Sequence, residues 1–224
     1  MIRLIIFDMD GLMFDTEAAT MRAYLEVGKS FGLPVTKEQF IKTLGKNYND
    51  ILRQYQMDFG EDCDPDGLYK AVGEVRNQSF TKYGPPVKDG LRALLAVLEE
   101  KGIPLAVASG SDDDVIRNNL ALTGVAKYFS YVLSSRNVEK GKPAPDVFLA
   151  ICDHFGVLPE ETLVFEDSPN GIKAAIAGGI PVIAVPDLIP VPEDLSRHCL
   201  AVFPSLTETV GLVQDLINDN SNEE

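Results

Sequence analysis

Two acidic side chains, Asp8 and Asp10, follow directly on a short apolar segment near the start of the chain, residues 4–7. Such a segment is typical of a strand buried on both faces of a sheet, where an unpaired charge would be costly. The strand is therefore expected to end at a crevice open to water and ligand. Two carboxylates in one small space, followed at once by Gly11, suit a nucleophile beside a bound cation.

Polar side chains stand in the same place after two later apolar segments. Ser109 follows one of them, and Glu166 with Asp167 follows the other. Because parallel strands end at the same edge of a sheet, these residues are expected to converge with the first acidic pair on one site. Lys142 should reach the same edge on the loop at residues 139–145.

Each of these residues also has a structural alternative. Asp8 could cap a turn, and Ser109 could cap the helix that follows it. Glu166 and Asp167 could cap the next helix, although capping needs only one carboxylate. Lys142 taken alone is most simply a solvated surface charge. The order and spacing of the whole set favour a shared site over these separate roles.

From residue 85 onward, apolar segments alternate with helical patterns. Strands are expected at residues 104–108, 131–133, 162–165 and 182–185, and helices at 89–100, 112–122, 144–155 and 170–177. Repeated strand-helix units of this kind indicate the α/β class. The expected architecture is a parallel, doubly wound, Rossmann-like sheet covered by helices.

The block between the first strand and this alternation shows apolar residues at helical intervals and no convincing strand. One of its helices is expected from Thr36, which has the capping-box spacing with Gln39. We therefore expect two domains, a core of residues 1–15 and 85–224 and an α-helical cap of residues 16–84.

The composition argues against several functional classes. The chain has 224 residues, 45% of them apolar, and a formal charge of −14, so we expect a globular protein that does not bind nucleic acid. Short apolar segments and the lack of a secretory leader favour a cytoplasmic protein without membrane contact. Three widely spaced cysteines indicate reduced thiols, and two isolated histidines argue against a histidine-based mechanism.

Four segments together resemble the signatures of the haloacid dehalogenase superfamily, in its branch of small phosphatases and phosphomutases related to β-phosphoglucomutase. They are DMDGLMFDTE at residues 8–17, VASGS at 107–111, KGKPAPDVF at 140–148 and FEDSPNGIKAAIAGG at 165–179. The resemblance implies an α/β core with a helical cap inserted between the first and second segments. It also implies an enzyme that acts on a small phosphorylated metabolite.

On this resemblance, Asp8 is expected to attack phosphorus and form an aspartyl phosphate, because a carboxylate is ionised at neutral pH and can be released again by water. Asp10 would protonate the leaving oxygen and later take a proton from the attacking water. The resemblance also implies Mg²⁺, held by Asp8, Asp167 and the backbone carbonyl of Asp10. Glu166 would bind the metal or position a water on it.

The phosphate group is expected to bind to Ser109, to the nearby backbone amides of Gly110 and Ser111, and to Lys142. A hydroxyl, amides and one ammonium would stabilise charge on the transferring oxygens. We therefore expect a Mg²⁺-dependent phosphatase whose substrate is a sugar phosphate or a nucleoside monophosphate.

The cap bears on two alternatives. Relatives with mutase activity place a histidine and an arginine where this chain has Thr20 and Tyr48, so a phosphatase is favoured over a β-phosphoglucomutase-like enzyme. The alternative from another class is an inactive protein that binds a phosphorylated ligand for regulation. Weaker candidates for substrate contact are Thr16, which could equally cap a helix, Lys46, Asn47 and Arg76, which could equally be a surface residue.

Overall fold

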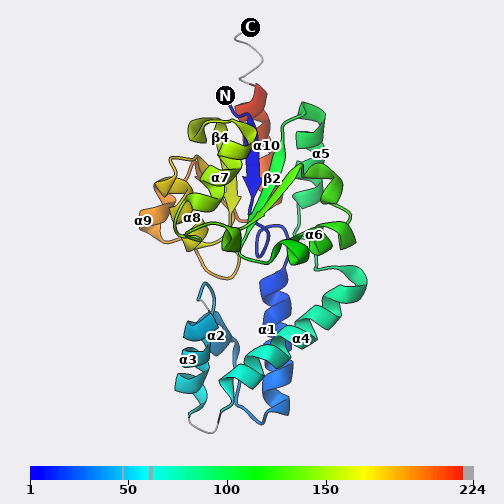
Figure 1. The fold of residues 1–224 in the computed structure, drawn as a ribbon, viewed down its shortest axis with the longest axis vertical. Coiled ribbons are helices and arrows are strands. Elements are labelled where there is room, and N and C mark those ends of the chain that lie inside the picture. The colour runs from blue at the N-terminus through cyan, green and yellow to red at the C-terminus, as the bar shows by residue number, and fades with distance from the viewer. Residues whose placement is uncertain (47, 61–62, 219–224) are drawn as a thin grey trace. The chain divides into compact units, whose positions relative to one another are not determined.

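The computed structural model describes residues 1–46, 48–60 and 63–218. The chain divides into two compact units, Met1–Phe14 with Pro86–Glu224 and Asp15–Pro85. Each unit is described by itself below (Figure 1). Asp15 and Pro85, expected in the core domain, group with the second unit in the structure.

The first unit is built on a six-stranded parallel sheet with the order β3-β2-β1-β4-β5-β6. Its strands are β1 (Leu4–Phe7), β2 (Leu105–Ser109), β3 (Tyr131–Ser134), β4 (Thr162–Glu166), β5 (Val182–Ala184) and β6 (Ala201–Val202). Strand β1 lies at the centre, and its Phe7 is in register with Val107 of β2 and Phe165 of β4. The strand order reverses at β1, which is the position where open α/β sheets form a ligand-binding crevice.

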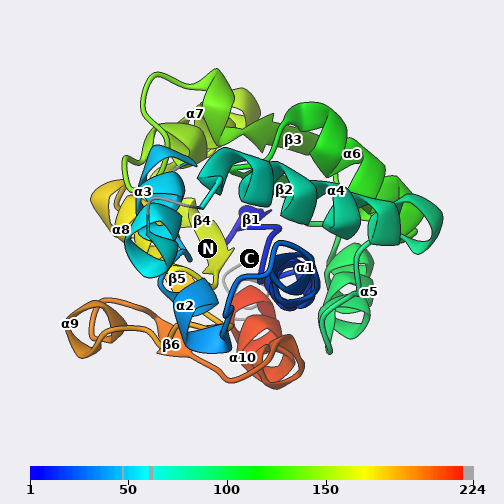
Figure 2. The same ribbon diagram turned by 90° about the horizontal axis from the view of Figure 1, so that it is seen from below.

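Helices cover both faces of this sheet. One face packs on α5 (Leu91–Lys101), α6 (Asp113–Leu122) and α10 (Leu206–Asn218), and the other on α7 (Asp146–Phe155), α8 (Pro169–Ala177) and α9 (Glu193–Ser196). Figure 2 shows α7 and α8 on one side of the strands and α5 and α10 on the other. Three short 3₁₀ helices, η1 (Ala126–Tyr128), η2 (Ser135–Asn137) and η3 (Pro159–Glu161), complete the connections. The predicted doubly wound parallel sheet is therefore confirmed.

Strand β1 lies entirely in the buried core of the first unit. Its four side chains alternate between two apolar clusters, Leu4 and Ile6 on the α7 and α8 side and Ile5 and Phe7 on the other. All four are fully buried, as expected for a central parallel strand.

In the first unit, the ends of the expected elements differ from the structure by one or two residues, whereas α9, β6, α10 and the three 3₁₀ helices were not predicted. Strand β6 has only two residues, too few to show a pattern. Helix α10 has buried side chains at Leu206, Val213 and Ile217, and this spacing is a helical signal present in the sequence.

The chain leaves and re-enters the first unit at neighbouring points. Phe14 forms an antiparallel bridge with Val87, and the Lys88 amide donates to the Met13 carbonyl at 2.9 Å. The second unit is therefore an insertion whose two connections start side by side.

The second unit consists of α1 (Thr16–Ser30), α2 (Lys37–Ile41), α3 (Tyr48–Phe59) and α4 (Pro65–Tyr83), and its described residues contain no strand. The Thr36 hydroxyl accepts from the Gln39 amide, and the Gln39 side chain accepts from the Thr36 amide, so the predicted capping box is confirmed. The core of this unit is aromatic, with Tyr24 between Phe40 and Tyr55. Of the helices in the described parts of the chain, none is long and apolar enough to cross a membrane.

Candidate active site

The acidic pair lies at the carboxyl end of β1, where the backbone is held on both sides. The Asp8 amide donates to the Phe165 carbonyl at 3.0 Å, which continues the pairing of β1 with β4 by one residue. The chain then turns at Gly11, whose φ of +88° lies in the left-handed region that favours glycine. Met9 and Met13 are fully buried and anchor this turn, so the two acidic side chains are presented from a rigid support.

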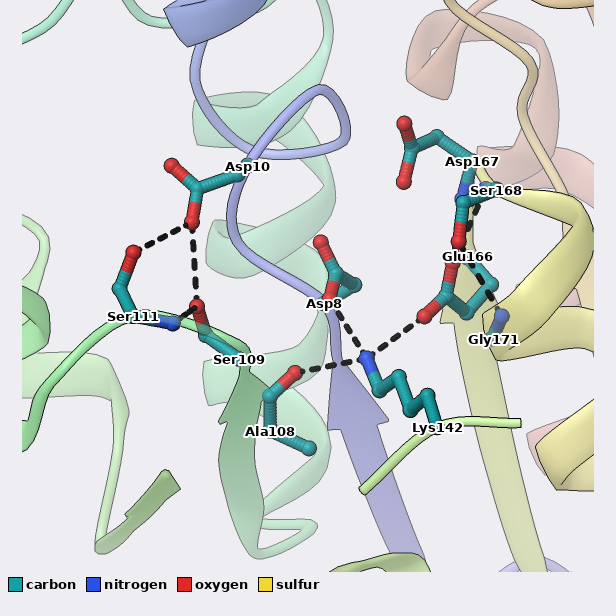
Figure 3. Close-up of polar contacts among 10 residues, drawn as sticks. All are labelled: Asp8, Asp10, Ala108, Ser109, Ser111, Lys142, Glu166, Asp167, Ser168 and Gly171. Carbon is teal, nitrogen blue, oxygen red and sulfur yellow. Dashed lines mark hydrogen bonds and ion pairs between the residues drawn. The ribbon is translucent and has the colours of Figure 1, made fainter. Parts of the chain in front are cut away.

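Lys142 binds two carboxylates at once. Its Nζ lies 2.6 Å from Asp8 Oδ1, 2.6 Å from Glu166 Oε1 and 3.0 Å from the Ala108 carbonyl oxygen (Figure 3). The three donors of the ammonium are thus matched by three acceptors. Burial disfavours the Lys142 cation, but Asp8 and Glu166 outweigh burial and raise the pKa of Lys142 above its ordinary value. Lys142, whose side chain is only 11% exposed, is therefore a cation held between two carboxylates and not the surface lysine of the alternative interpretation.

Glu166 is fully buried and has both oxygens engaged. Oε1 accepts from Lys142, while Oε2 accepts from the backbone amides of Asp167 and Ser168 and from the Ser168 hydroxyl, each at 3.0 Å. A Cβ on Gly171, in the first turn of α8, would lie only 1.7 Å from Oε1. In this structure Glu166 holds Lys142 and the start of α8, and its predicted contact with a metal or a metal-bound water stays a prediction.

Asp10 has a different set of partners from Asp8. Its Oδ2 accepts from the hydroxyls of Ser109 at 3.1 Å and Ser111 at 2.9 Å. The Ser111 amide in turn donates to the Ser109 hydroxyl at 3.0 Å. Figure 3 shows Asp10 on the Ser109 side of Asp8 and Lys142 on the Glu166 side. Ser109 and Ser111, predicted to bind phosphate together with Gly110, thus contact the second carboxylate, and their phosphate contact stays a prediction.

Asp167 lies against the turn after β1. It is nearly buried, and a Cβ on Gly11 would lie 2.2 Å from its Oδ2, so this close approach depends on glycine. Within residues 1–46, 48–60 and 63–218, no three His, Cys, Asp or Glu side chains are grouped so that they could hold a metal ion. The predicted metal ligands therefore lie near the carboxyl edge of the sheet but do not form a group of side chains that could hold a metal ion. They are Asp8, Asp10, Glu166 and Asp167.

The site carries an excess of negative charge. Burial raises the pKa of the Asp8 carboxyl, Lys142 opposes this shift, and the charges of Glu166 and Asp10 add to it. Among the described residues, Asp8 and Glu166 share the one ammonium of Lys142, and the charge of Asp10 adds to theirs. A further cation would lower the pKa of Asp8 and keep it ionised.

The candidates in the second unit have local partners. Thr16 is buried as the first residue of α1, and Asp15 precedes it at the N-cap without a side-chain capping bond. Lys46 donates to Gln54 at 2.7 Å, and Arg76 donates to the side chain of Asn77. Asn47 lies outside the described residues. Contact between these residues and a substrate stays a prediction.

Two residues of the site region, Ser168 and Arg136, were not among the predicted site residues. Ser168 caps α8 by accepting from the Gly171 amide and donates to Glu166. A serine directly before Pro169 is a helix-start signal that could have identified it. Arg136 binds the loop that carries Ser111, and no motif in the sequence points to it.

A sequence model of the haloacid dehalogenase-like hydrolases matches residues 5–185, which is most of the chain. The chain belongs to this family. A fructose-1-phosphate phosphatase of Escherichia coli is 33% identical over 183 residues, which are 81% of this chain and 95% of that protein. A phosphorylated carbohydrates phosphatase of Thermotoga maritima is 31% identical over 179 residues, 79% of this chain and 81% of its own. The predicted family and the predicted enzyme class, a phosphatase-type hydrolase, are confirmed.

A solved structure shows the same fold over nearly the whole chain. A candidate β-phosphoglucomutase of Thermotoga maritima superposes with a TM-score of 0.80 at 26% identity, covering 96% of this haloacid dehalogenase-like hydrolase and 100% of that chain. The match includes both units, so the inserted helical unit is a shared feature of the two proteins.

Proposed function

We propose that this protein is a Mg²⁺-dependent phosphatase that hydrolyses a small phosphorylated metabolite through a phosphoaspartate on Asp8. The observation that carries the proposal is the unequal environment of two carboxylates only two residues apart. Asp8 is nearly buried and paired with the ammonium of Lys142, whereas Asp10 is half-buried and hydrogen-bonded to two hydroxyls. Neighbouring carboxylates in different environments are typical of sites in which one acts as nucleophile and the other as acid and base.

In the first half of the reaction, a carboxylate oxygen of Asp8 attacks phosphorus and the bond from phosphorus to the ester oxygen breaks. Asp10 donates a proton to that leaving oxygen, so an alcohol departs. Lys142 lies 2.6 Å from Asp8 Oδ1 and stabilises the negative charge that gathers on the transferring oxygens.

In the second half, Asp10 is left as a carboxylate and takes a proton from a water molecule. The resulting hydroxide attacks phosphorus, and the bond between phosphorus and the Asp8 oxygen breaks, which releases inorganic phosphate and restores Asp8. The hydroxyls of Ser109 and Ser111 keep the Asp10 carboxylate in place between the two proton transfers.

The residues at the strand edge fit Mg²⁺ by the chemistry of their donors. Mg²⁺ prefers oxygen ligands and is usually held by one or two carboxylates together with waters and substrate phosphate. Asp8 and Asp167 would supply the carboxylates and Asp10 its backbone carbonyl, and the close packing of Asp167 on Gly11 brings that carboxylate next to the acidic turn. When bound, the ion would neutralise charge on the phosphoryl group.

For the substrate we propose a sugar phosphate first and a nucleoside monophosphate second. The support is that the two relatives described above act on fructose 1-phosphate and on phosphorylated carbohydrates by their names. The proposed phosphate site, Ser109, Gly110, Ser111 and Lys142, includes one cationic side chain, which suits a monoester better than a larger polyanion.

The test is release of inorganic phosphate from p-nitrophenyl phosphate and from a panel of phosphorylated sugars and nucleosides. The native chain is assayed with Mg²⁺ and with EDTA, beside Asp8→Asn and the surface control Arg3→Ala. We expect activity in the native chain and the control, and loss with EDTA and in Asp8→Asn. Full activity of Asp8→Asn would overturn the phosphoaspartate mechanism, and full activity in EDTA would overturn the metal requirement.

One arm of the assay addresses the mutase alternative. Glucose 1-phosphate is supplied with a bisphosphate primer, and the products are separated. We expect free glucose and inorganic phosphate to accumulate, whereas accumulation of glucose 6-phosphate would replace the phosphatase with a phosphomutase.

A further inference from the structure

Arg136 is an exposed residue of η2 that reaches across to the loop after β2. Its Nε donates to the Gly110 carbonyl at 3.1 Å, and its Nη1 donates to both carboxylate oxygens of Asp112 at 2.9 Å. Gly110 and Asp112 are the two neighbours of Ser111. One guanidinium therefore holds the loop on both sides of a residue that contacts Asp10.

Beside Arg136, the loop is held by Ser111, which contacts Ser109 and Asp10, and by the Asp112 carbonyl, which accepts from the Ile116 amide. Gly110 and Asp112 are exposed, and a Cβ on Gly110 would meet no atom within 4 Å. The next residue, Asp113, begins α6 and is held separately, because it accepts from the Ser134 amide at 3.0 Å and from Asn137 at 2.7 Å. Polar contacts from η2 and its flank thus set the loop conformation where apolar packing is lacking.

We propose that Arg136 is a positioning residue for the acid and base Asp10, acting through Ser111. The planar fork of the guanidinium matches a carbonyl and a carboxylate at fixed spacing, and so fixes the backbone around Ser111. The Ser111 hydroxyl, 2.9 Å from Asp10 Oδ2, and its amide, 3.0 Å from the Ser109 hydroxyl, then hold the carboxylate orientation. This inference rests on the proposed phosphatase function.

Misplacing a general acid lowers the rate most for the substrate whose leaving group depends most on protonation. An aryl oxide departs readily without protonation, whereas an alkoxide does not. Loss of Arg136 should therefore slow alkyl phosphate hydrolysis more than aryl phosphate hydrolysis. A merely structural role would slow both reactions by the same factor.

The experiment measures kcat and KM on p-nitrophenyl phosphate and on the best alkyl phosphate of the panel. We expect Arg136→Ala to lower kcat on the alkyl ester about tenfold and on the aryl ester about twofold or less, a part of the 10²- to 10⁴-fold contribution typical of general acid–base catalysis. Arg136→Lys keeps the positive charge but loses the planar fork of the guanidinium, so its kcat on the alkyl ester should lie between those of the native chain and Arg136→Ala. Arg3→Ala, which removes another exposed arginine with a carboxylate partner, is the matched control and should change neither rate.

Two further measurements separate the alternatives. Arg136→Ala should melt within about 2 °C of the native chain, because exposed ion pairs contribute little to stability. In the Asp10→Asn background, Arg136→Ala should have no additional effect on the alkyl ester, since both changes act on one group.

Equal loss on both esters, no loss on either, or fully additive loss with Asp10→Asn would each overturn the inference. The proposed function fails separately, by retained activity of Asp8→Asn, so the two failures are distinguishable.

Discussion

Gly171 is the position where one added carbon is expected to disturb the site most. It lies in the first turn of α8, where a Cβ would be 1.7 Å from Glu166 Oε1 and 1.9 Å from Glu166 Cδ. Glu166 cannot move away at low cost, because it is fully buried and its oxygens accept from Lys142 and from the start of α8. Gly171→Ala therefore has two opposite effects on stability: alanine favours the helix, but its Cβ disrupts the buried hydrogen bonds of Glu166.

The expected sign follows from the magnitudes. Alanine in place of glycine in an unobstructed helix stabilises a protein by roughly 0.5–1 kcal/mol. Overpacking a buried site costs about 1–3 kcal/mol, and each lost hydrogen bond to a charged group costs about 1.5–3 kcal/mol. If Glu166 moves far enough to break one or two such bonds, the free energy of unfolding falls by about 3–5 kcal/mol. In a chain of this size that lowers Tm by about 10 °C.

The measurement is thermal and urea unfolding of the full chain, with phosphate release assayed on the same samples. Gly211→Ala is the matched control, because Gly211 lies in α10 and a Cβ there meets no atom within 4 Å. We expect the control to be at least as stable as the native chain and fully active. A second variant, Glu166→Asp with Gly171→Ala, shortens the carboxylate and should recover part of the lost stability. If Gly171→Ala melts at or above the native Tm with native activity, the reasoning about Glu166 is refuted.

Three other predictions follow from the contacts of the first unit. Lys142→Met should abolish phosphate release and lower the free energy of unfolding by about 3–5 kcal/mol in urea titrations, because it leaves two buried carboxylates without their ammonium; native stability would contradict this. Gly11→Ala should raise the Mg²⁺ concentration needed for half-maximal activity, since its Cβ would lie 2.2 Å from Asp167 Oδ2 at a φ of +88°, whereas Gly32→Ala, with a positive φ and open space, should not. Burial raises the pKa of the Cys152 thiol, so iodoacetamide should label Cys152 more slowly in the native chain than in urea, and equal labelling rates would contradict the burial. Because the pKa of Cys152 is higher in the folded chain than in the unfolded one, the contribution of this thiol to stability is present below the unfolded pKa and is lost as pH rises through the folded pKa.

The central elements of the fold were predictable because their patterns are strong and local. The fully buried residues of β1 form a continuous apolar segment, and the capping box of Thr36 and Gln39 depends on four consecutive residues. Strand β6 was not predictable, since two residues carry no periodicity and the strand exists only because β5 offers it a pairing edge. Helix α10 was predictable in principle, because its buried face repeats at helical spacing.

The members of the site were predictable from parallel topology, but their pairing was not. Strand ends place Asp8, Ser109 and Glu166 at one edge whatever their contacts. Which carboxylate Lys142 binds depends on the path of the loop between β3 and α7, and this path carries no sequence pattern. The contact of Ser111 with Asp10 likewise depends on the bend at Gly110, whose carbonyl accepts from Arg136, 26 residues further along the chain.

The two carboxylates after β1 belong to the same residue type and the same turn, so their proposed roles must come from their neighbours. Asp8 faces β4 and the loop before α7, which provide Glu166 and the ammonium of Lys142. Asp10 faces the end of β2 and the loop after it, which provide the hydroxyls of Ser109 and Ser111. Burial raises the pKa of the Asp8 carboxyl, and the ammonium of Lys142 opposes that shift and favours the anion that would attack phosphorus. Asp10, held by two hydroxyls at a half-buried position, is the carboxyl proposed to exchange a proton with the leaving group and with water. The division of labour thus follows from the strand order, because β1 has β2 on one side and β4 on the other.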